Sequence, residues 1–311
     1  MAVGSNIRQR RYELHMSQQE LAELMGYKTR STIAKIESGE NDVSHKKLVR
    51  FAEVLDTTVE RLVSGYSVGE TELAPVLSAK KEKTVAIILA GGKTGRNSQN
   101  IPSQFVNVKG RPIIVYCMES YQKHPSVDAV YVVCLKGWER IVKDYAAQYG
   151  ITKLKGIITG AGSGVASLKN ALDYVKELYS ADDLVIIQEA TRPMVNPEMI
   201  SKLIQAANEK GSATICHLMN DYVQFDISGG KPKYVDRNNM IALQSPEAHR
   251  LSLMLAVFAR AQKQRHPLTE SCCTMLLYNL GYSINFVESS VNNIKIAREE
   301  DSAAFSVLIR D

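Results

Sequence analysis

The stretch LAGGKTGRNSQNIPSQF, residues 89–105, combines residue types that can hold a phosphate group. The apolar run Thr84–Leu89 is typical of a buried strand, and it leads directly into Gly91 and Gly92. Without a Cβ in the way, the backbone N–H groups of such a turn can approach and cradle an anion. An arginine, Arg96, follows within the loop, so the stretch predicts a phosphate-binding site.

A loop that holds a triphosphate needs a second cation near its end. The position that would carry it lies between Pro102 and Gln104, and it is occupied by Ser103. Lys93 lies earlier in the loop and is a candidate replacement for the missing cation. The sequence therefore leaves open whether the loop transfers a phosphoryl group or only binds one.

The elements that would position this loop are strands alternating with helices. Apolar, β-branched runs predict strands at TVAIIL (84–89), AVYVVCL (129–135), LKGIITG (154–160), DLVIIQEA (183–190), SATICHL (212–218) and SINFVE (283–288). Helical patterns lie between them, for example at Ile113–Lys123 and Gly164–Glu177. This alternation predicts a mostly parallel sheet with helices on both faces. Ligands of such sheets bind beyond the carboxyl ends of the strands.

Motifs in a fixed order over residues 84–309 resemble the methylerythritol-phosphate and ribitol-phosphate cytidylyltransferases, and the ribitol type more closely. The matching segments are AGGKTGR (90–96), TGAGSGVASL (159–168), EATRP (189–193), VDRN (235–238), SPE (245–247) and NIKIA (293–297). The resemblance implies an α/β, Rossmann-like nucleotide-diphospho-sugar transferase fold. It also implies that the acceptor phosphate attacks the α-phosphorus of CTP, with Mg²⁺ and protein cations balancing the charge.

The resemblance assigns roles to individual positions. It implies nucleotide binding by Ala90, Gly91, Gly92, Lys93, Arg96, Gly160, Ser167 and Glu189. It implies polyol-phosphate binding by Arg192, Arg237 and Ser245, and catalytic positions at Arg96, Ser103 and Lys295. Glu189 would also be the metal ligand.

Several of these positions depart from the family pattern. Ser103 stands where the family has a lysine, Glu189 where it has aspartate, Gly164 where it has arginine, and Glu247 where it has glutamine. Losing one preorganised donor to a transition state costs about 10²–10³ in rate. We therefore expect a degenerate active site, unless Lys93 replaces the lost lysine.

The N-terminal part follows a different pattern, of one short helix after another. In SQQELAELMGYKTRSTIAKIESGEN, Ser17 and Glu20 form a capping box that predicts a helix start at Ser17. Leu21, Leu24 and Met25 are predicted to form its apolar face. Gly26 is predicted to end this helix, and a second one should begin near Arg30 or Ser31 with Ile33 and Ile36 inward.

These two helices, with LVRFAEVLDTTVERLV after them, resemble the lambda-repressor-like (XRE) helix-turn-helix family over residues 7–63. The resemblance implies that the second helix enters the major groove of double-stranded DNA. The predicted readers are Arg30, Ser31, Thr32 and Lys35, with Gln18 and Gln19 touching phosphate or a base edge. Arg8, Arg10 and Arg11 are predicted to add phosphate contacts. The alternative is a small bundle that mediates protein contacts only.

Length and composition are those of an ordinary globular protein. The chain has 311 residues, 45% hydrophobic and 23% charged, with a net charge of +5. We predict a helix-turn-helix domain at 1–67, a Gly, Pro and Lys-containing linker at 68–82, and a cytidylyltransferase-like domain at 83–311. No apolar stretch approaches the ~20 residues of a membrane span, and we expect a cytoplasmic protein without a membrane partner.

The cysteines and histidines predict no metal centre. The five cysteines include no CxxC pair, and we expect them to be buried thiols in their reduced form. The six histidines show no metal-ligand spacing, so no zinc site is predicted.

Together these observations lead to one hypothesis and two alternatives. The leading one is a homodimeric transcription regulator whose degenerate cytidylyltransferase-like domain senses a phosphorylated polyol, CTP or a CDP-polyol. The first alternative is an active CTP-dependent cytidylyltransferase with a fused DNA-binding domain. The second is an interaction module that binds neither DNA nor ligand.

Overall fold

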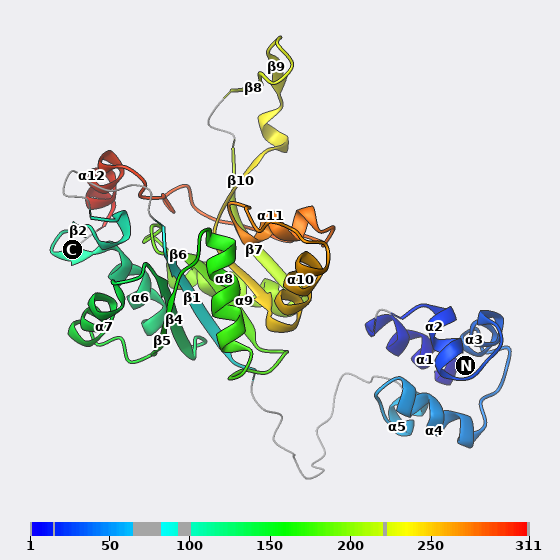
Figure 1. Cartoon of the computed structure of the whole chain (residues 1–311). Helices are drawn as coiled ribbons and strands as arrows, with labels where there is room; N and C mark the ends of the chain where they lie inside the picture. Colours follow the sequence, from blue (N-terminus) through cyan, green and yellow to red (C-terminus); the bar gives the residue numbers. More distant parts are fainter. Residues whose placement is uncertain (1, 15, 65–81, 93–100, 220–222, 310–311) are drawn as a thin grey trace. The chain divides into compact units, whose positions relative to one another are not determined.

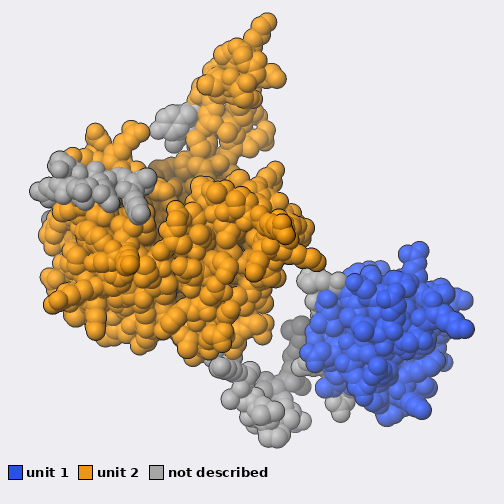
Figure 2. Space-filling model, viewed as in Figure 1, with its two compact units in different colours: residues 1–79 blue, residues 80–311 orange. Residues whose placement is uncertain are grey.

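The computed structural model describes residues 2–14, 16–64, 82–92, 101–219 and 223–309. The chain divides into two compact units, residues 1–79 and 80–311 (Figure 2). The predicted linker, 68–82, lies outside the described residues up to residue 81. Among the helices that are described, none is both long and apolar enough to cross a membrane.

The first unit is a bundle of short helices. Its described helices are α1 (Ala2–Glu13), α2 (Gln18–Leu24), α3 (Arg30–Glu37), α4 (His45–Val54) and α5 (Val59–Ser64) (Figure 1). The predicted capping box is present at α2, where the Ser17 hydroxyl accepts from the Glu20 N–H and the Glu20 carboxylate accepts from the Ser17 N–H. Gly26 has a φ of +76°, which lets the chain turn sharply between α2 and α3.

The core of the first unit is built from one face of each helix. Ile33 and Ile36 of α3 are buried against Leu21 and Phe51, as their spacing predicts. Leu24 is 52% exposed, so its predicted place on the apolar face is wrong. Because α2 turns the side carrying Leu21, Ala22 and Met25 toward the core, Leu24 lies past the edge of that face.

The second unit is built on a seven-stranded sheet, with described strands in the order β11-β7-β10-β6-β1-β4-β5. These strands are β1 (Thr84–Ala90), β4 (Ala129–Cys134), β5 (Leu154–Thr159), β6 (Leu184–Glu189), β7 (Ser212–Leu218), β10 (Ile241–Arg250) and β11 (Phe286–Glu288). The strand pairs around β1, namely β1–β4, β1–β6 and β4–β5, are parallel, as is β7–β11. The strand β10 is antiparallel to both neighbours and was not expected from the sequence.

Helices cover both faces of this sheet and complete two cores (Figure 1). One face carries α6 (Ile113–Lys123), α7 (Glu139–Gln148) and α9 (Pro197–Lys210), and the other carries α8 (Gly164–Val175), α10 (Leu251–Lys263) and α11 (Cys273–Asn279). The central strands β1, β4 and β6 are almost wholly buried because both of their faces are covered.

The remaining elements lie at the margins. The turn η1 (Ser103–Phe105), the short pair β2 (Asn107–Val108) and β3 (Arg111–Pro112), and α12 (Glu299–Leu308) lie together at one end. The strands β8 (Gln224–Asp226) and β9 (Lys233–Val235), with η2 (Arg237–Asn239), form an arm that stands out from the sheet beyond β7 and β10 (Figure 1).

Candidate functional site

A pocket of about 410 Å³ lies at the carboxyl ends of β1 and β6, where the fold class predicts a ligand. It is lined by residues 89–92, the first turn of α8 with its preceding loop, the end of β6, part of β10, residues 271–273 and residues 295–297. We call it the glycine-loop pocket. Of the predicted site residues, the structure places Ala90, Gly91, Gly92, Ser167, Glu189, Ser245 and Lys295 in its wall.

Close backbone packing forms the base of this pocket. A Cβ on Gly160 would lie 3.2 Å from Ser167 Oγ and 3.3 Å from the Cys134 carbonyl oxygen, so the position tolerates glycine best. The Ser167 hydroxyl accepts a hydrogen bond from the Ala161 N–H at 2.8 Å, and only 3% of the Ser167 surface is exposed. Ser167 therefore fixes the loop that faces the pocket.

Two further side chains hold the phosphate-binding elements in place. Gln104 donates from Nε2 to the Ala90 carbonyl at 2.7 Å and to the Gly92 carbonyl at 3.2 Å, which ties the Pro-x-Gln-Phe segment to the glycine turn. Ser163 caps α8 by accepting from the Ala166 N–H at 3.0 Å. The N-terminus of α8 thus opens onto the pocket, where its dipole favours an anion.

The charged centre of the pocket is a three-residue cluster. The Glu189 carboxylate contacts Lys295 Nζ through Oε1 and Arg192 Nε through Oε2, the latter at 2.8 Å. Burial alone would raise the pKa of Glu189, but Lys295 and Arg192 outweigh it, so the pKa is lowered from its ordinary value. Arg192 also donates to the Asn293 carbonyl at 2.9 Å. The cations predicted to meet a phosphate are thus engaged with a carboxylate.

Ser245 has a structural partner rather than an open hydroxyl. Its Oγ accepts from the Glu189 N–H at 3.1 Å and from Gln188 Nε2 at 3.3 Å. Asn293 Nδ2 donates to the Ser245 carbonyl at 2.8 Å, so the end of β6, β10 and the segment before Lys295 are tied together.

The acidic residues of the pocket could hold Mg²⁺ only in part. Glu189 and Glu247 are the acidic residues among the described lining of the pocket. Mg²⁺ binds through one or two carboxylates together with substrate phosphates and water. Glu189 could supply one such oxygen if Lys295 shifted toward the nucleotide, and the ion would then neutralise charge on the phosphates.

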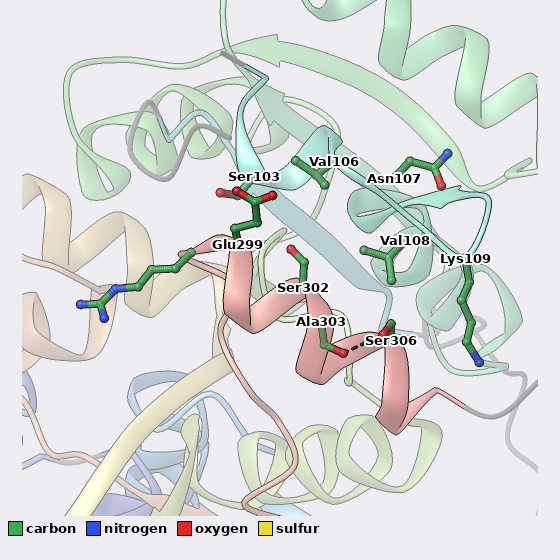
Figure 3. Close-up of a pocket in the computed structure, with 10 residues that line it drawn as sticks. Ser103, Val106, Asn107, Val108, Lys109, Glu299, Ser302, Ala303 and Ser306 are labelled. Carbon is green, nitrogen blue, oxygen red and sulfur yellow. Dashed lines mark hydrogen bonds between the residues drawn. The ribbon is translucent and has the colours of Figure 1, made fainter. Parts of the chain in front are cut away.

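Ser103 lies elsewhere. It lines a separate cavity of about 400 Å³ between η1, β2 and α12, together with Val106, Glu299 and Ser302 (Figure 3). Ser103 is not among the described residues that line the glycine-loop pocket. The structure therefore does not bring Ser103 and Lys295 to one cavity wall.

Five other predicted positions are not in the described wall of the pocket, namely Gly160, Arg192, Arg237, Lys93 and Arg96. Arg237 is exposed in η2 on the projecting arm, apart from Ser245, so one chain does not form the predicted polyol-phosphate pair. Lys93 and Arg96 lie outside the described residues.

The candidate DNA interface lies on α3. Arg30, Ser31 and Lys35 are exposed, and Thr32 is half-buried. The Ser31 hydroxyl lies 2.8 Å from that of Thr29, just before the helix. Arg30, Ser31 and Thr32 thus form the first turn of a helix whose opposite face is buried, and Lys35 lies in its last turn.

Residues of α1 and α2 have structural contacts that the sequence did not indicate. Arg11 forms a buried two-point ion pair with Glu37, at 2.6 and 3.0 Å, and Gln18 donates to the same carboxylate at 2.8 Å. Arg10 donates to backbone carbonyls at the end of α4. Arg11 is buried beside Glu37, so the phosphate contact predicted for Arg11 is wrong.

Two other predicted DNA-contact residues are exposed. They are Arg8 and Gln19, and Gln19 donates to the Glu23 carboxylate.

The sequence also missed residues of the pocket. Gln104, Cys272 and Cys273 line it, and Asn293 supports it. Gln104 could have been found, because it belongs to the Pro-x-Gln-Phe segment that follows the glycine turn. No local sequence pattern marks Cys272 and Cys273 as pocket residues. Their place depends on where α11 packs against β10.

Known proteins resemble both units. The sequence profile of the family described as 2-C-methyl-D-erythritol 4-phosphate cytidylyltransferase matches residues 84–311, and that described as Helix-turn-helix matches residues 7–62. A ribitol-5-phosphate cytidylyltransferase from Lacticaseibacillus paracasei is 32% identical over 228 residues, which cover 73% of this chain and 97% of the relative. A 2-C-methyl-D-erythritol 4-phosphate cytidylyltransferase from Clostridium botulinum is 29% identical and covers 70% and 94%.

Solved structures agree on the fold. The 4-diphosphocytidyl-2C-methyl-D-erythritol synthase from Anaerococcus prevotii has a TM-score of 0.62 at 18% identity, over 73% of this chain and 98% of its own. The mostly parallel sheet and the helices on its two faces account for that likeness. The chain therefore belongs to the 2-C-methyl-D-erythritol 4-phosphate cytidylyltransferase family, and it carries a helix-turn-helix DNA-binding domain ahead of that domain.

Proposed function

We propose that the protein is a transcription regulator whose cytidylyltransferase-like domain binds a phosphorylated polyol, CTP or a CDP-polyol as an effector. The DNA-binding part of the proposal rests on the exposed face of α3. The ligand part rests on the glycine-loop pocket, which offers a glycine turn and a helix N-terminus to a phosphate.

One observation carries the preference for binding over catalysis. Lys295 is the single cation among the described residues of the pocket wall, and Glu189 already neutralises it. Transfer to the α-phosphorus of CTP builds negative charge on the transition state and on leaving pyrophosphate. A pocket whose described cation is already paired with a carboxylate suits ligand capture better than turnover.

The test is pyrophosphate release measured beside calorimetric binding. The full-length protein would be given CTP, Mg²⁺ and a panel of polyol phosphates. We expect saturable binding with no release above the protein-free rate. Lys295→Met should weaken binding at least several-fold, while Lys202→Met, an exposed lysine on α9, should leave it unchanged. Absence of binding by every ligand in the panel would remove the sensor proposal.

The second candidate is an active cytidylyltransferase with a fused DNA-binding domain. It is favoured by the L. paracasei relative, whose match spans nearly its whole length at 32% identity. Lys93 or Arg96 would then supply the cation that Ser103 does not. Steady pyrophosphate release that depends on both CTP and one polyol phosphate would establish this reading.

We also propose that the protein works as a homodimer. The arm exposes Val223, Phe225, Ile227 and Tyr234, each more than half exposed, and a second copy is the occupant that would cover them. In such a dimer Arg237 could meet a ligand in the partner's pocket, which would reconcile its predicted role with its exposed position. Light scattering should give a dimer mass for the wild type and a monomer mass for Phe225→Ser, with the more exposed Val307→Ser as the control.

A further inference from the structure

A second cluster of side chains lies behind the glycine-loop pocket. Glu247 and His249 project from the same face of β10, and Cys273 begins α11, whose next residue, Thr274, donates to Glu247. One potential ligand atom from each of the three lies within 4.8 Å of the other two. All three residues are buried, with 4%, 1% and 2% of their surface exposed.

His249 is the anomaly in this cluster. Neither ring nitrogen has a hydrogen-bond partner among the described residues, although both are buried. A buried polar group without a partner costs about 1–3 kcal/mol. Glu247 Oε2 lies 3.7 Å from His249 Nε2, too far for a hydrogen bond, and it accepts instead from the N–H and hydroxyl of Thr274. A ligand between the two side chains would give His249 the partner it lacks.

The spacing suits a divalent metal ion. Zinc bound tetrahedrally at about 2.0–2.3 Å separates neighbouring ligand atoms by roughly 3.3–3.8 Å, and oxygen and nitrogen ligands lie at the short end of that range. The carboxylate–imidazole separation of 3.7 Å is within a few tenths of an ångström of that spacing, and a small closure would bring in the Cys273 sulfur as well. Hydrogen bonds from Thr274 would orient the Glu247 carboxylate, as outer-shell partners do at metal sites.

The charges balance as well. A carboxylate, a thiolate and a neutral imidazole carry two negative charges, which one divalent ion cancels, so the buried site becomes neutral overall. Thiolate, imidazole and carboxylate together favour zinc over magnesium or calcium.

We propose that Glu247, His249 and Cys273 form a binding site for zinc or a similar transition-metal ion. Because Glu247 and Cys273 also line the glycine-loop pocket, a fourth ligand, water or an anionic ligand atom, can reach the metal from the pocket. Three protein ligands and one exchangeable position are a common zinc arrangement. The site also gives a physical role to Glu247, which departs from the glutamine of the family pattern.

The first experiment uses the full-length, untagged wild-type protein. After incubation with Zn²⁺ and dialysis, elemental analysis should find about one zinc per chain. Zn²⁺ should also raise the unfolding temperature followed by the fluorescence of Trp138, the single tryptophan, because an ion that binds the native state stabilises it. Cobalt in place of zinc should give a thiolate-to-metal absorption band, which reports a cysteine ligand without any mutation.

Variants then assign the ligands. His249→Gln and Cys273→Ser should each retain less than a tenth of the zinc, and Cys273→Ser should lose the cobalt–thiolate band. Cys272→Ser is the matched control, since Cys272 is the adjacent cysteine but is not in the cluster. It should keep both the zinc and the band. Circular dichroism of each variant checks that it is folded.

Clear outcomes would overturn the proposal. One is a wild-type protein that holds no zinc and whose Trp138 transition does not move with millimolar Zn²⁺. Another is zinc retained equally by His249→Gln and Cys273→Ser, or lost on Cys272→Ser alone. Either result would mean that His249 is buried without a metal partner.

Discussion

The two units of the chain each contain a carboxylate held by cations, but they use it differently. In the helix-turn-helix unit, the Arg11–Glu37 pair is almost fully buried, with side chains 4% and 2% exposed. In the second unit, Glu189 is paired with Lys295 and Arg192 beside an open pocket, and Lys295 is 47% exposed. Arg11 and Glu37, together with Gln18, join three helices, whereas the Glu189 cluster faces the glycine-loop pocket.

In the first unit the predicted base readers on α3 are separate from the buried ion pair, whereas in the second unit Lys295 is both an ion-pair partner and a candidate ligand contact. The predicted readers on α3 have no part in the Arg11–Glu37 pair, so reading can change without loss of the fold. In the pocket, Lys295 is both a partner of Glu189 and the candidate for a ligand phosphate. A bound anion must compete with Glu189 for that lysine, which favours exchange of ligands over tight transition-state binding.

The largest effect is expected from Glu37→Ala. Removing the carboxylate leaves the Arg11 guanidinium buried without its counter-charge, which costs about 3–5 kcal/mol of folding free energy. Far-UV circular dichroism reports helices of both units, while Trp138 reports the second unit only. We expect the unfolding transition followed by dichroism to be destabilised and the transition followed by Trp138 fluorescence to be unchanged.

The control is Glu53→Ala, which removes an exposed ion pair with Arg50 and should cost less than about 1 kcal/mol of folding free energy. Equal stability of the two variants would contradict the structural role of Glu37.

The next effect concerns the exposed face of α3. Arg30→Ala should weaken binding to a duplex selected with the wild-type protein by about 1–3 kcal/mol, the usual loss for one base contact. Stability should not change, because Arg30 is exposed. Arg140→Ala, on α7 of the second unit, removes the same charge and serves as the control. Fluorescence anisotropy at fixed salt would measure both, and equal weakening by the two variants would point to net charge rather than reading.

The smallest effect concerns Glu189. Its pKa is lowered from the ordinary 4.5, so its contribution to stability is present above that value and is lost as pH falls through the folded-state pKa. At pH 7, Glu189→Gln should therefore be less stable than wild type by about 1 kcal/mol, because Lys295 is half-exposed. Urea unfolding followed by Trp138 should show this difference shrinking in acid. If the difference in unfolding free energy between wild type and Glu189→Gln stays constant from pH 7 to pH 3, then Glu189 is not stabilised by its ion pairs.

Local patterns predicted the elements that depend on near neighbours. The capping box at Ser17, the start of α3 at Arg30 and the helix Ile113–Lys123 agree with the structure, because caps and apolar spacing act within a few residues. The order of the motifs indicated the fold class. The strand β10 was missed, because its polar and proline-containing sequence becomes a strand only between β6 and β7.

Contacts across long separations decided the rest. Glu247 and His249 lie two residues apart, but Cys273 follows 24 residues after His249 and joins them only because α11 packs on β10. No ligand spacing in the sequence could show that cluster, and the sequence led to the expectation of no zinc site. The burial of Arg11 beside Glu37 has the same origin. The sequence by itself determined the family and those elements that caps and apolar spacing mark, since these follow from motif order and local propensity. Only the tertiary structure decided which charged and metal-binding side chains meet, because burial and pairing depend on how distant elements pack.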